Sequence, residues 1–253
     1  MRPGRLSVVG LGPGAEAWIT PDASETIASA QDIVGYEPYV ARIAVRQGQV
    51  RHASDNRVEL DRARLAIDLA RQGRNVAVVS GGDPGVFAMA AAVFEAIEAD
   101  PDSRDLDVHV VPGVSAMQAA AARLGAPLGH DFCAISLSDN LKPWTLVARR
   151  LRAAADGDFV IALYNPASKA RPRTIFEAFD LLRATKDGAT PVVFARAISR
   201  ADERVVVTTL AEADPGLADM ATLVLIGSSE TRIVERTGRT PWVYTPRRSL
   251  QPA

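Results

Sequence analysis

Short apolar runs alternate with amphipathic segments through the first half of the chain. Residues 58–71 place Leu60, Ala63 and Ile67 among charges at helical spacing, which predicts a surface helix with one buried face. Thr20 followed by Pro21 is typical of a helix start, so we expect a helix that continues to about residue 30. Strands are predicted over residues 6–11, 33–35, 75–79 and 108–111, and a further helix over 86–97. This alternation favours a mostly parallel sheet with helices on both faces.

The second half of the chain has a mixed pattern. Helices are predicted over residues 115–124, 143–155 and 173–183, and strands over 132–137, 159–163, 192–195, 205–208 and 223–226. Only a short turn separates two of these strands, at residues 198–203, which favours an antiparallel pair. We therefore expect two α/β domains, residues 1–115 and 116–253. Because no flexible linker joins them, they are expected to enclose a shared cleft.

Composition narrows the classes of function. The 253 residues are 47% hydrophobic, and 29 Lys and Arg nearly balance 30 Asp and Glu, so no general attraction to nucleic acid or to an anionic membrane is expected. Cys133 is the only cysteine in the sequence, which excludes an intrachain disulfide and a thiolate metal cluster. No apolar run is long enough to span a bilayer, and glycines from Gly10 onward interrupt the first run. We expect a cytoplasmic protein.

A glycine-rich loop, Gly10-Leu11-Gly12-Pro13-Gly14, follows the first predicted strand. Glycines allow a ligand to approach the backbone closely, although a turn shaped only for packing explains the motif equally well. The spacing differs from the dinucleotide pattern Gly-x-Gly-x-x-Gly, and Pro13 lacks the amide hydrogen that a pyrophosphate would require. A nicotinamide-dependent reductase would also need an acidic residue after the second strand. Glu37 is near that position, but it is expected to lie in a loop between Tyr36 and Pro38.

Two further strand-to-helix junctions carry glycine. Ser80-Gly81-Gly82-Asp83-Pro84 follows the strand at residues 75–79, and Pro112-Gly113-Val114-Ser115-Ala116 follows the strand at residues 108–111. Ligands of open α/β sheets bind at such carboxyl ends of strands. Asp83 supplies a carboxylate there and is also a candidate helix cap. The recurrence of these loops predicts that several of them line one binding site.

The order of the three loops resembles that of the tetrapyrrole methylases, and the resemblance covers nearly the whole chain. It implies two α/β domains that bind S-adenosylmethionine between them, in a fold unlike that of Rossmann-type methyltransferases, and a homodimer. In the first domain and at the boundary, the resemblance implies that the cofactor contacts Pro13, Gly81, Gly82, Asp83, Val86, Ser115 and Ala116. In the second domain it implies contacts with Asn165, Ala197, Thr222 and Gly227.

A second group of motifs resembles the branch of this family that methylates carbon 17 of a corrinoid precursor in cobalamin (vitamin B12) biosynthesis. The motifs are Gly129-His130-Asp131-Phe132, residues 135–144 and residues 161–169. Within them Asn140 and Lys142 depart from the branch pattern, which has an apolar residue and a threonine at these positions. The candidate substrate-binding residues are Ser136, Ser138, Trp144, Tyr164, Lys169 and Arg171. Cationic groups suit the substrate's carboxylates, and aromatic rings suit its flat face.

The implied chemistry is attack by a ring carbon on the methyl group of a sulfonium, for which positioning is the main requirement and no metal is needed. S-adenosylhomocysteine would be the product. The resemblance also implies contraction of the macrocycle, which a general base would assist. His130 is the first candidate and Asp139 the second, although His130 also suits a solvent-facing position and Asp139 a helix cap. The metal-free and cobalt-containing precursors both remain open as substrates. A non-catalytic corrinoid-binding protein is a third hypothesis.

Overall fold

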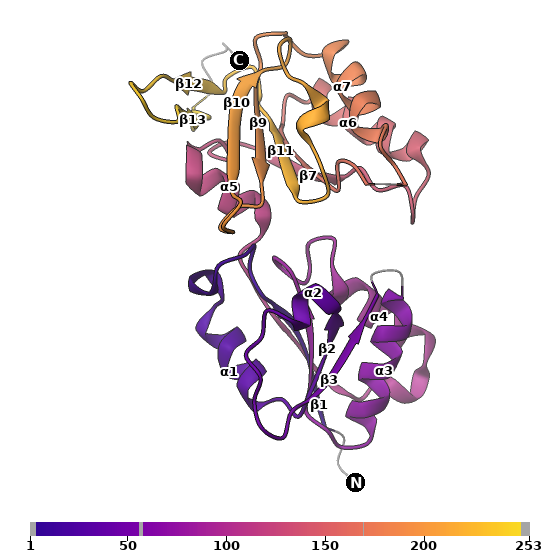
Figure 1. Cartoon of the computed structure of the whole chain (residues 1–253). Coiled ribbons are helices and arrows are strands. Elements are labelled where there is room, and N and C mark those ends of the chain that lie inside the picture. The colour runs from indigo at the N-terminus through magenta and orange to yellow at the C-terminus, as the bar shows by residue number, and fades with distance from the viewer. Residues whose placement is uncertain (1–3, 56–57, 169, 249–253) are drawn as a thin grey trace. The chain divides into compact units, whose positions relative to one another are not determined.

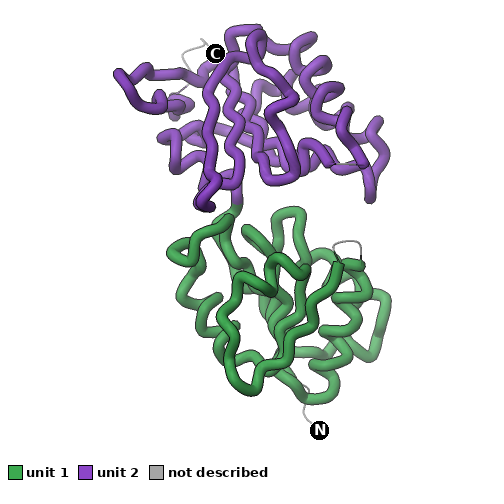
Figure 2. Tube along the Cα trace, viewed as in Figure 1, with its two compact units in different colours: residues 1–115 green, residues 116–253 purple. Residues whose placement is uncertain are grey.

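The chain forms two compact units, residues 1–115 and 116–253 (Figure 2). The computed structural model describes residues 4–55, 58–168 and 170–248, so the candidate Lys169 lies outside the described residues. Each unit contains a five-stranded sheet. None of the helices in the described ranges is both long and apolar enough to cross a lipid bilayer.

Unit 1 is a parallel sheet with the strand order β3-β2-β4-β1-β5 and helices on both faces (Figure 1). One face packs against two long helices through Leu6, Val34 and Val78, and the other packs against two shorter helices through Val9 and Val79. The strands are β1 (Arg5–Gly10), β2 (Asp32–Tyr36), β3 (Val50–Ser54), β4 (Val76–Ser80) and β5 (Asp107–Val111). The helices are α1 (Pro21–Ser29), α2 (Glu37–Val40), α3 (Glu59–Arg71) and α4 (Met89–Ala99).

The predicted alternation of strands and helices in unit 1 is confirmed, with two corrections. The hydroxyl of Thr20 accepts a hydrogen bond from the Ala23 amide at 3.1 Å and begins α1 as expected. In contrast, α4 begins at Met89 rather than at residue 86, because Phe87 has a φ of 53° and leaves the helical region. The prediction also missed α2 and β3, so Glu37 opens a one-turn helix instead of lying in a loop.

Unit 2 has a mixed sheet, as the sequence predicted, and the structure shows its strand order to be β10-β9-β11-β8-β7. Only β7 and β8 are parallel neighbours, and the predicted antiparallel pair is β9 with β10. The strands are β7 (Phe132–Ser136), β8 (Val160–Tyr164), β9 (Pro191–Arg196), β10 (Arg204–Thr209) and β11 (Thr222–Ile226). The helices are α5 (Ala116–Leu124), α6 (Trp144–Asp156) and α7 (Thr174–Arg183). A small second sheet joins β6 (Gly125–Ala126), β12 (Arg232–Val234) and β13 (Trp242–Tyr244).

The buried carboxylate of Asp32 forms hydrogen bonds that stabilise the amino-terminal edge of the unit 1 sheet. Asp32, at the start of β2, is 1% exposed and accepts a hydrogen bond from His52 Nε2 at 2.8 Å and another from Arg74 Nε. Burial by itself would raise the pKa of Asp32, but the bonds to Arg74 and His52 outweigh that effect and hold the pKa below its ordinary value. The ionised carboxylate therefore stabilises the folded state.

We expect Asp32→Asn to lower the free energy of unfolding by about 2 kcal/mol at pH 7, because charged hydrogen bonds are lost. The folded-state pKa is depressed, so this contribution is present above the unfolded value of about 4 and is lost as pH falls below it. Urea unfolding at pH 7, 4 and 3 should show a gap between parent and variant that narrows with acid. Asp61→Asn, in an exposed pair with Arg64, is the control. A gap that is constant with pH would contradict the prediction.

Candidate cofactor and substrate site

Three loops meet at the carboxyl edge of the unit 1 sheet. They follow β1, β4 and β5, which are parallel neighbours, so their ends lie side by side. Gly12 and Gly82 exchange two backbone hydrogen bonds, of 3.2 and 2.9 Å, which join the first loop to the second. The carboxylate of Asp83 accepts a 3.0 Å bond from the amide of Gly113, which joins the second loop to the third.

Glycine is required where these loops touch. A Cβ atom on Gly10 would lie 2.7 Å from the carbonyl oxygen of Gly82, and one on Gly113 would lie 2.3 Å from the same oxygen. Gly82 itself has a φ of 68°, a conformation that side chains disfavour. Packing between backbones thus explains Gly10 and Gly113 without a ligand. The candidate cofactor residues Pro13, Gly81 and Gly82 in these loops are half-buried.

Asp83 orders its own loop rather than capping α4. Its Oδ1 accepts a 2.8 Å bond from the amide of Gly85, while its Oδ2 binds Gly113. The side chain that meets the start of α4 is Ser80, whose hydroxyl accepts a 3.3 Å bond from the amide of Met89. Each carboxylate oxygen can accept a second hydrogen bond, so Asp83 keeps the capacity to bind a ligand hydroxyl. Val86, half-buried, follows in the same loop.

A second group of candidates gathers at one edge of the unit 2 sheet. Strands β7, β8 and β9 end at this edge, and β11, which runs in the opposite direction, begins there with Thr222. Thr222 pairs with Arg196 in the sheet, and continuing the β8–β11 register places it opposite Asn165. Asn165 and Ala197 follow the ends of β8 and β9. The fold thus brings Ser136, Asn165, Ala197 and Thr222 to a single edge.

Two of these residues have unusual backbone conformations. Asn165 has a φ of 51° and Ala197 a φ of 49°, in the left-handed region that residues with a side chain rarely occupy. Such conformations cost about 1 kcal/mol or more and collect at functional sites. The side-chain amide of Asn165 donates a 3.0 Å bond to the hydroxyl of buried Ser136, which also accepts a 3.3 Å bond from the amide of Ser138. Ser136 therefore orients Asn165, and its contact with the substrate stays a prediction.

Sequence reasoning missed two residues that hold this edge together. Asp219 accepts a 2.7 Å bond from the hydroxyl of Thr222 and a 2.8 Å bond from Arg196. Burial by itself would raise the pKa of Asp219, but these two bonds keep the pKa below its ordinary value. The hydroxyl of Thr222 donates to Asp219 and so holds the start of β11 in place. We therefore expect Thr222 to support a ligand site by positioning this strand.

Three of the predicted substrate residues near this edge, Trp144, Tyr164 and Arg171, contact other parts of unit 2. Arg171 Nε lies 3.4 Å from Asp139 Oδ1, and the Arg171 side chain is only 11% exposed. Its buried Nη1 has no hydrogen-bond partner among the described residues. The hydroxyl of Tyr164 accepts a 3.1 Å bond from the amide of Met117, and Trp144 packs against the core of unit 2. Arg171 is therefore an ion-pair partner of Asp139 rather than an exposed cation.

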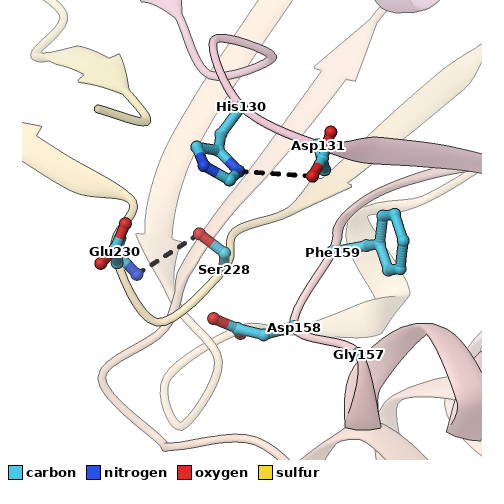
Figure 3. A pocket seen from close by; sticks show the side chains of 7 residues that line it. All are labelled: His130, Asp131, Gly157, Asp158, Phe159, Ser228 and Glu230. Carbon is cyan, nitrogen blue, oxygen red and sulfur yellow. Dashed lines mark hydrogen bonds and ion pairs between the residues drawn. The ribbon is translucent and has the colours of Figure 1, made fainter. Parts of the chain in front are cut away.

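His130 and Gly227 lie at the opposite edge of the unit 2 sheet. His130 precedes β7 and Gly227 follows β11, so each is separated from the first edge by a full strand of five residues, or about 17 Å. His130 is 37% exposed and lines a pocket of about 130 Å³ that Figure 3 shows from close by. Asp131, Gly157, Asp158, Phe159, Ser228 and Glu230 line the same pocket. The fold does not bring His130 together with Asp139.

The sequence of the chain matches a model of a known family. The family model "Tetrapyrrole (Corrin/Porphyrin) Methylases" matches residues 5–214. The chain belongs to this family.

Two similar proteins are named as C17-methyltransferases. The chain is 59% identical to "Precorrin-3B C(17)-methyltransferase" of Sinorhizobium sp over 96% of both sequences. It is 41% identical to "Probable cobalt-factor III C(17)-methyltransferase" of Salmonella typhimurium, over 95% of this chain and 99% of that one.

Solved structures agree with this assignment. The "methyltransferase CobJ" superposes with a TM-score of 0.92 at 53% identity, over 96% of this chain and all of that chain. A uroporphyrin-III C-methyltransferase from Thermus thermophilus, solved with S-adenosylhomocysteine, gives a TM-score of 0.66 at 25% identity, over 88% of this chain and 92% of that one. The expected fold, two α/β units of the tetrapyrrole methylase type, is confirmed.

Proposed function

We infer that this protein is an S-adenosylmethionine-dependent methyltransferase that methylates C17 of precorrin-3B in cobalamin biosynthesis. The observation that carries the inference is the 59% identity to the Sinorhizobium enzyme over nearly the full length of both chains. The same reaction contracts the macrocycle and gives precorrin-4. The first loop pairs with Gly82 instead of presenting a dinucleotide turn, which argues against the nicotinamide-dependent alternative.

The loops at the carboxyl edge of the unit 1 sheet have the backbone and the carboxylate that suit binding of S-adenosylmethionine. Gly81 and Gly82 carry no side chain and are half-buried, so a ligand can approach their backbone closely. Asp83 is held by two amides and can still accept a bond from a sugar hydroxyl. Ser115 and Ala116 follow the third loop, and the family resemblance also implies cofactor contacts with Asn165 and Ala197 of unit 2. We assign the cofactor to these residues with Pro13 and Val86, and assign Gly227 no contact.

The protein's contribution to methyl transfer is alignment. When bound, S-adenosylmethionine supplies a methyl group on a positively charged sulfur. An electron pair of C17 forms the new bond to that methyl carbon while the bond from sulfur breaks, which leaves S-adenosylhomocysteine. The chain's fixed loops hold the two partners in line and exclude water, which lowers the entropic part of the barrier.

Contraction requires the loss of a proton from a substrate hydroxyl as a neighbouring bond migrates. We assign the base to Asp139 rather than His130, because Asp139 lies near the edge that carries Asn165 and Thr222. A carboxylate 37% exposed and held by Arg171 is positioned to accept the proton. Lys169, Trp144 and Tyr164 stay candidate substrate contacts.

The metal-free precursor is the preferred substrate. The relative named for precorrin-3B is 59% identical to the chain, whereas the relative named for cobalt-factor III is 41% identical.

The family resemblance supports a homodimer, and the composition of the chain supports a cytoplasmic location. Light scattering over a dilution series tests the first, and a purely monomeric protein at micromolar concentration would refute it.

Mass spectrometry with methyl-labelled S-adenosylmethionine tests the function. We expect one labelled methyl group to be added to precorrin-3B, at C17, with contraction of the ring, and much slower turnover of cobalt-factor III. Label at another carbon would overturn the C17 assignment. Binding of S-adenosylhomocysteine with no transfer to either precursor would favour a non-catalytic corrinoid-binding protein.

A further inference from the structure

A partly buried arginine outside all the motifs contacts the first glycine loop. Arg42 follows α2, and its guanidinium donates to the carbonyl oxygens of Leu11 at 2.7 Å, Gly14 at 3.0 Å and Gly12 at 3.3 Å. A planar guanidinium can bind several carbonyl oxygens at fixed angles, which a flexible ammonium cannot do equally well. One side chain thus fixes three peptide groups of a five-residue loop.

These bonds complete a set of contacts around a single peptide. The oxygen of the peptide between Leu11 and Gly12 is held by Arg42, and its nitrogen donates to the carbonyl of Gly82 at 3.2 Å. The carbonyl oxygen and the amide nitrogen of this peptide are therefore both hydrogen-bonded, the first to Arg42 and the second to Gly82. Without Arg42 the loop would keep its contact with Gly82 but lose its restraint on the opposite side.

Arg42 is itself held in place. Arg51, on β3, donates to the carbonyls of Val40 at 3.3 Å and Ile43 at 2.7 Å, which lie on either side of Arg42. Helix α2, which precedes Arg42, also contacts the second loop. The ring of Tyr39 packs so closely on Gly81 that a Cβ atom at Gly81 would lie 2.8 Å from it. The segment at residues 36–43 therefore contacts two of the three loops that form the unit 1 edge.

We propose that Arg42 is a positioning residue for the cofactor, which holds the Gly10–Gly14 loop in the conformation that binds S-adenosylmethionine. The proposal rests on the proposed function, because it takes this loop to bind the cofactor. Arg42 acts through the loop, so its loss should weaken cofactor binding while the chemical step on bound substrates continues.

Calorimetry with S-adenosylhomocysteine and steady-state kinetics test the proposal. We expect Arg42→Met to weaken binding roughly 10- to 100-fold, the range for loss of charge-assisted hydrogen bonds. The KM for S-adenosylmethionine should rise by a similar factor, with kcat at saturation within about threefold of the parent. Arg42→Lys should recover part of the affinity, because an ammonium can still bind one or two of the carbonyls.

Arg183→Met is the matched control. Arg183 donates to the carbonyls of Leu210 and Ala213 at 3.1 and 2.6 Å, beyond the end of β10 and away from the candidate site edge. This variant should bind S-adenosylhomocysteine as the parent does. Amide hydrogen exchange should be faster at Leu11 and Gly12 in the Arg42→Met variant alone.

The outcomes separate the two proposals. Parent-like affinity of Arg42→Met, or an equal loss of affinity in Arg183→Met, would overturn the role of Arg42 and leave the methyltransferase function intact. A fall in kcat with unchanged KM would also overturn it. A parent protein that does not bind S-adenosylhomocysteine would overturn the proposed function itself.

Discussion

Replacing Gly82 with leucine is expected to abolish S-adenosylhomocysteine binding, with a loss of at least about 100-fold, or roughly 2.7 kcal/mol. Two causes act together. A leucine side chain would project from the loop to which we assign the cofactor. It would also strain the backbone, because the φ of 68° at Gly82 is poorly tolerated by residues with a Cβ atom. Titration calorimetry of the parent and the variant measures the effect.

Gly48→Leu separates loop disruption from simple destabilisation. Gly48 has a φ of 83°, lies before β3 at the opposite edge of unit 1, and has open space around the position of a Cβ atom. Leucine there carries the backbone strain without touching the loops. We expect lowered thermal stability in both variants but lost binding only in Gly82→Leu. If a folded Gly82→Leu protein binds as the parent does, the loop after β4 does not bind the cofactor.

The second large effect is expected for Asp139→Asn, which should slow ring contraction about 100-fold or more, the usual contribution of a general base. The amide keeps the size of the side chain but cannot accept the substrate's proton. A methylated, uncontracted species should accumulate and can be identified by mass spectrometry and NMR. His130→Ala should change the contraction rate less than about threefold, because a five-residue strand separates His130 from this edge.

Two controls test whether Asp139 acts chemically or only through its ion pair. Asp131→Asn removes an exposed carboxylate beside His130 and should have no effect. Arg171→Met removes the partner of Asp139. If Arg171→Met and Asp139→Asn both raise the KM for precorrin-3B and leave the contraction rate unchanged, Asp139 is a structural partner and not the base. Slow contraction in His130→Ala would restore the histidine as the base.

The sequence predicted the sheet-forming elements well because their local signals agree. β1 and β4 are buried on both faces and consist mostly of apolar residues, and α1 begins with a capping threonine and a proline. β3 is an edge strand containing Arg51 and His52, so it has no comparable apolar run and was missed. α2 is a single turn, too short for a periodic pattern.

The site was harder to predict because its geometry depends on strand direction and on contacts between distant residues. His130 and Asp139 are close in sequence, yet β7 lies between them and sends them to opposite edges. Arg42 contacts a loop about thirty residues earlier, and no local motif marks it. Ala197 has a left-handed backbone that alanine does not signal, whereas Gly82 was recognisable by its residue type.

The contact among Gly10, Gly82 and Gly113 also bears on folding. These glycines are about 70 and 30 residues apart in sequence, so the unit 1 edge is complete only after β1 has paired with both β4 and β5. Such non-local contacts form slowly, because chain closure must precede them. A ligand that requires all three loops binds the native unit and not its partly folded forms. At 100 times its dissociation constant it would add about 2.7 kcal/mol to stability. If S-adenosylmethionine is that ligand, as we propose, its supply is expected to influence how long this unit remains folded and resistant to proteolysis.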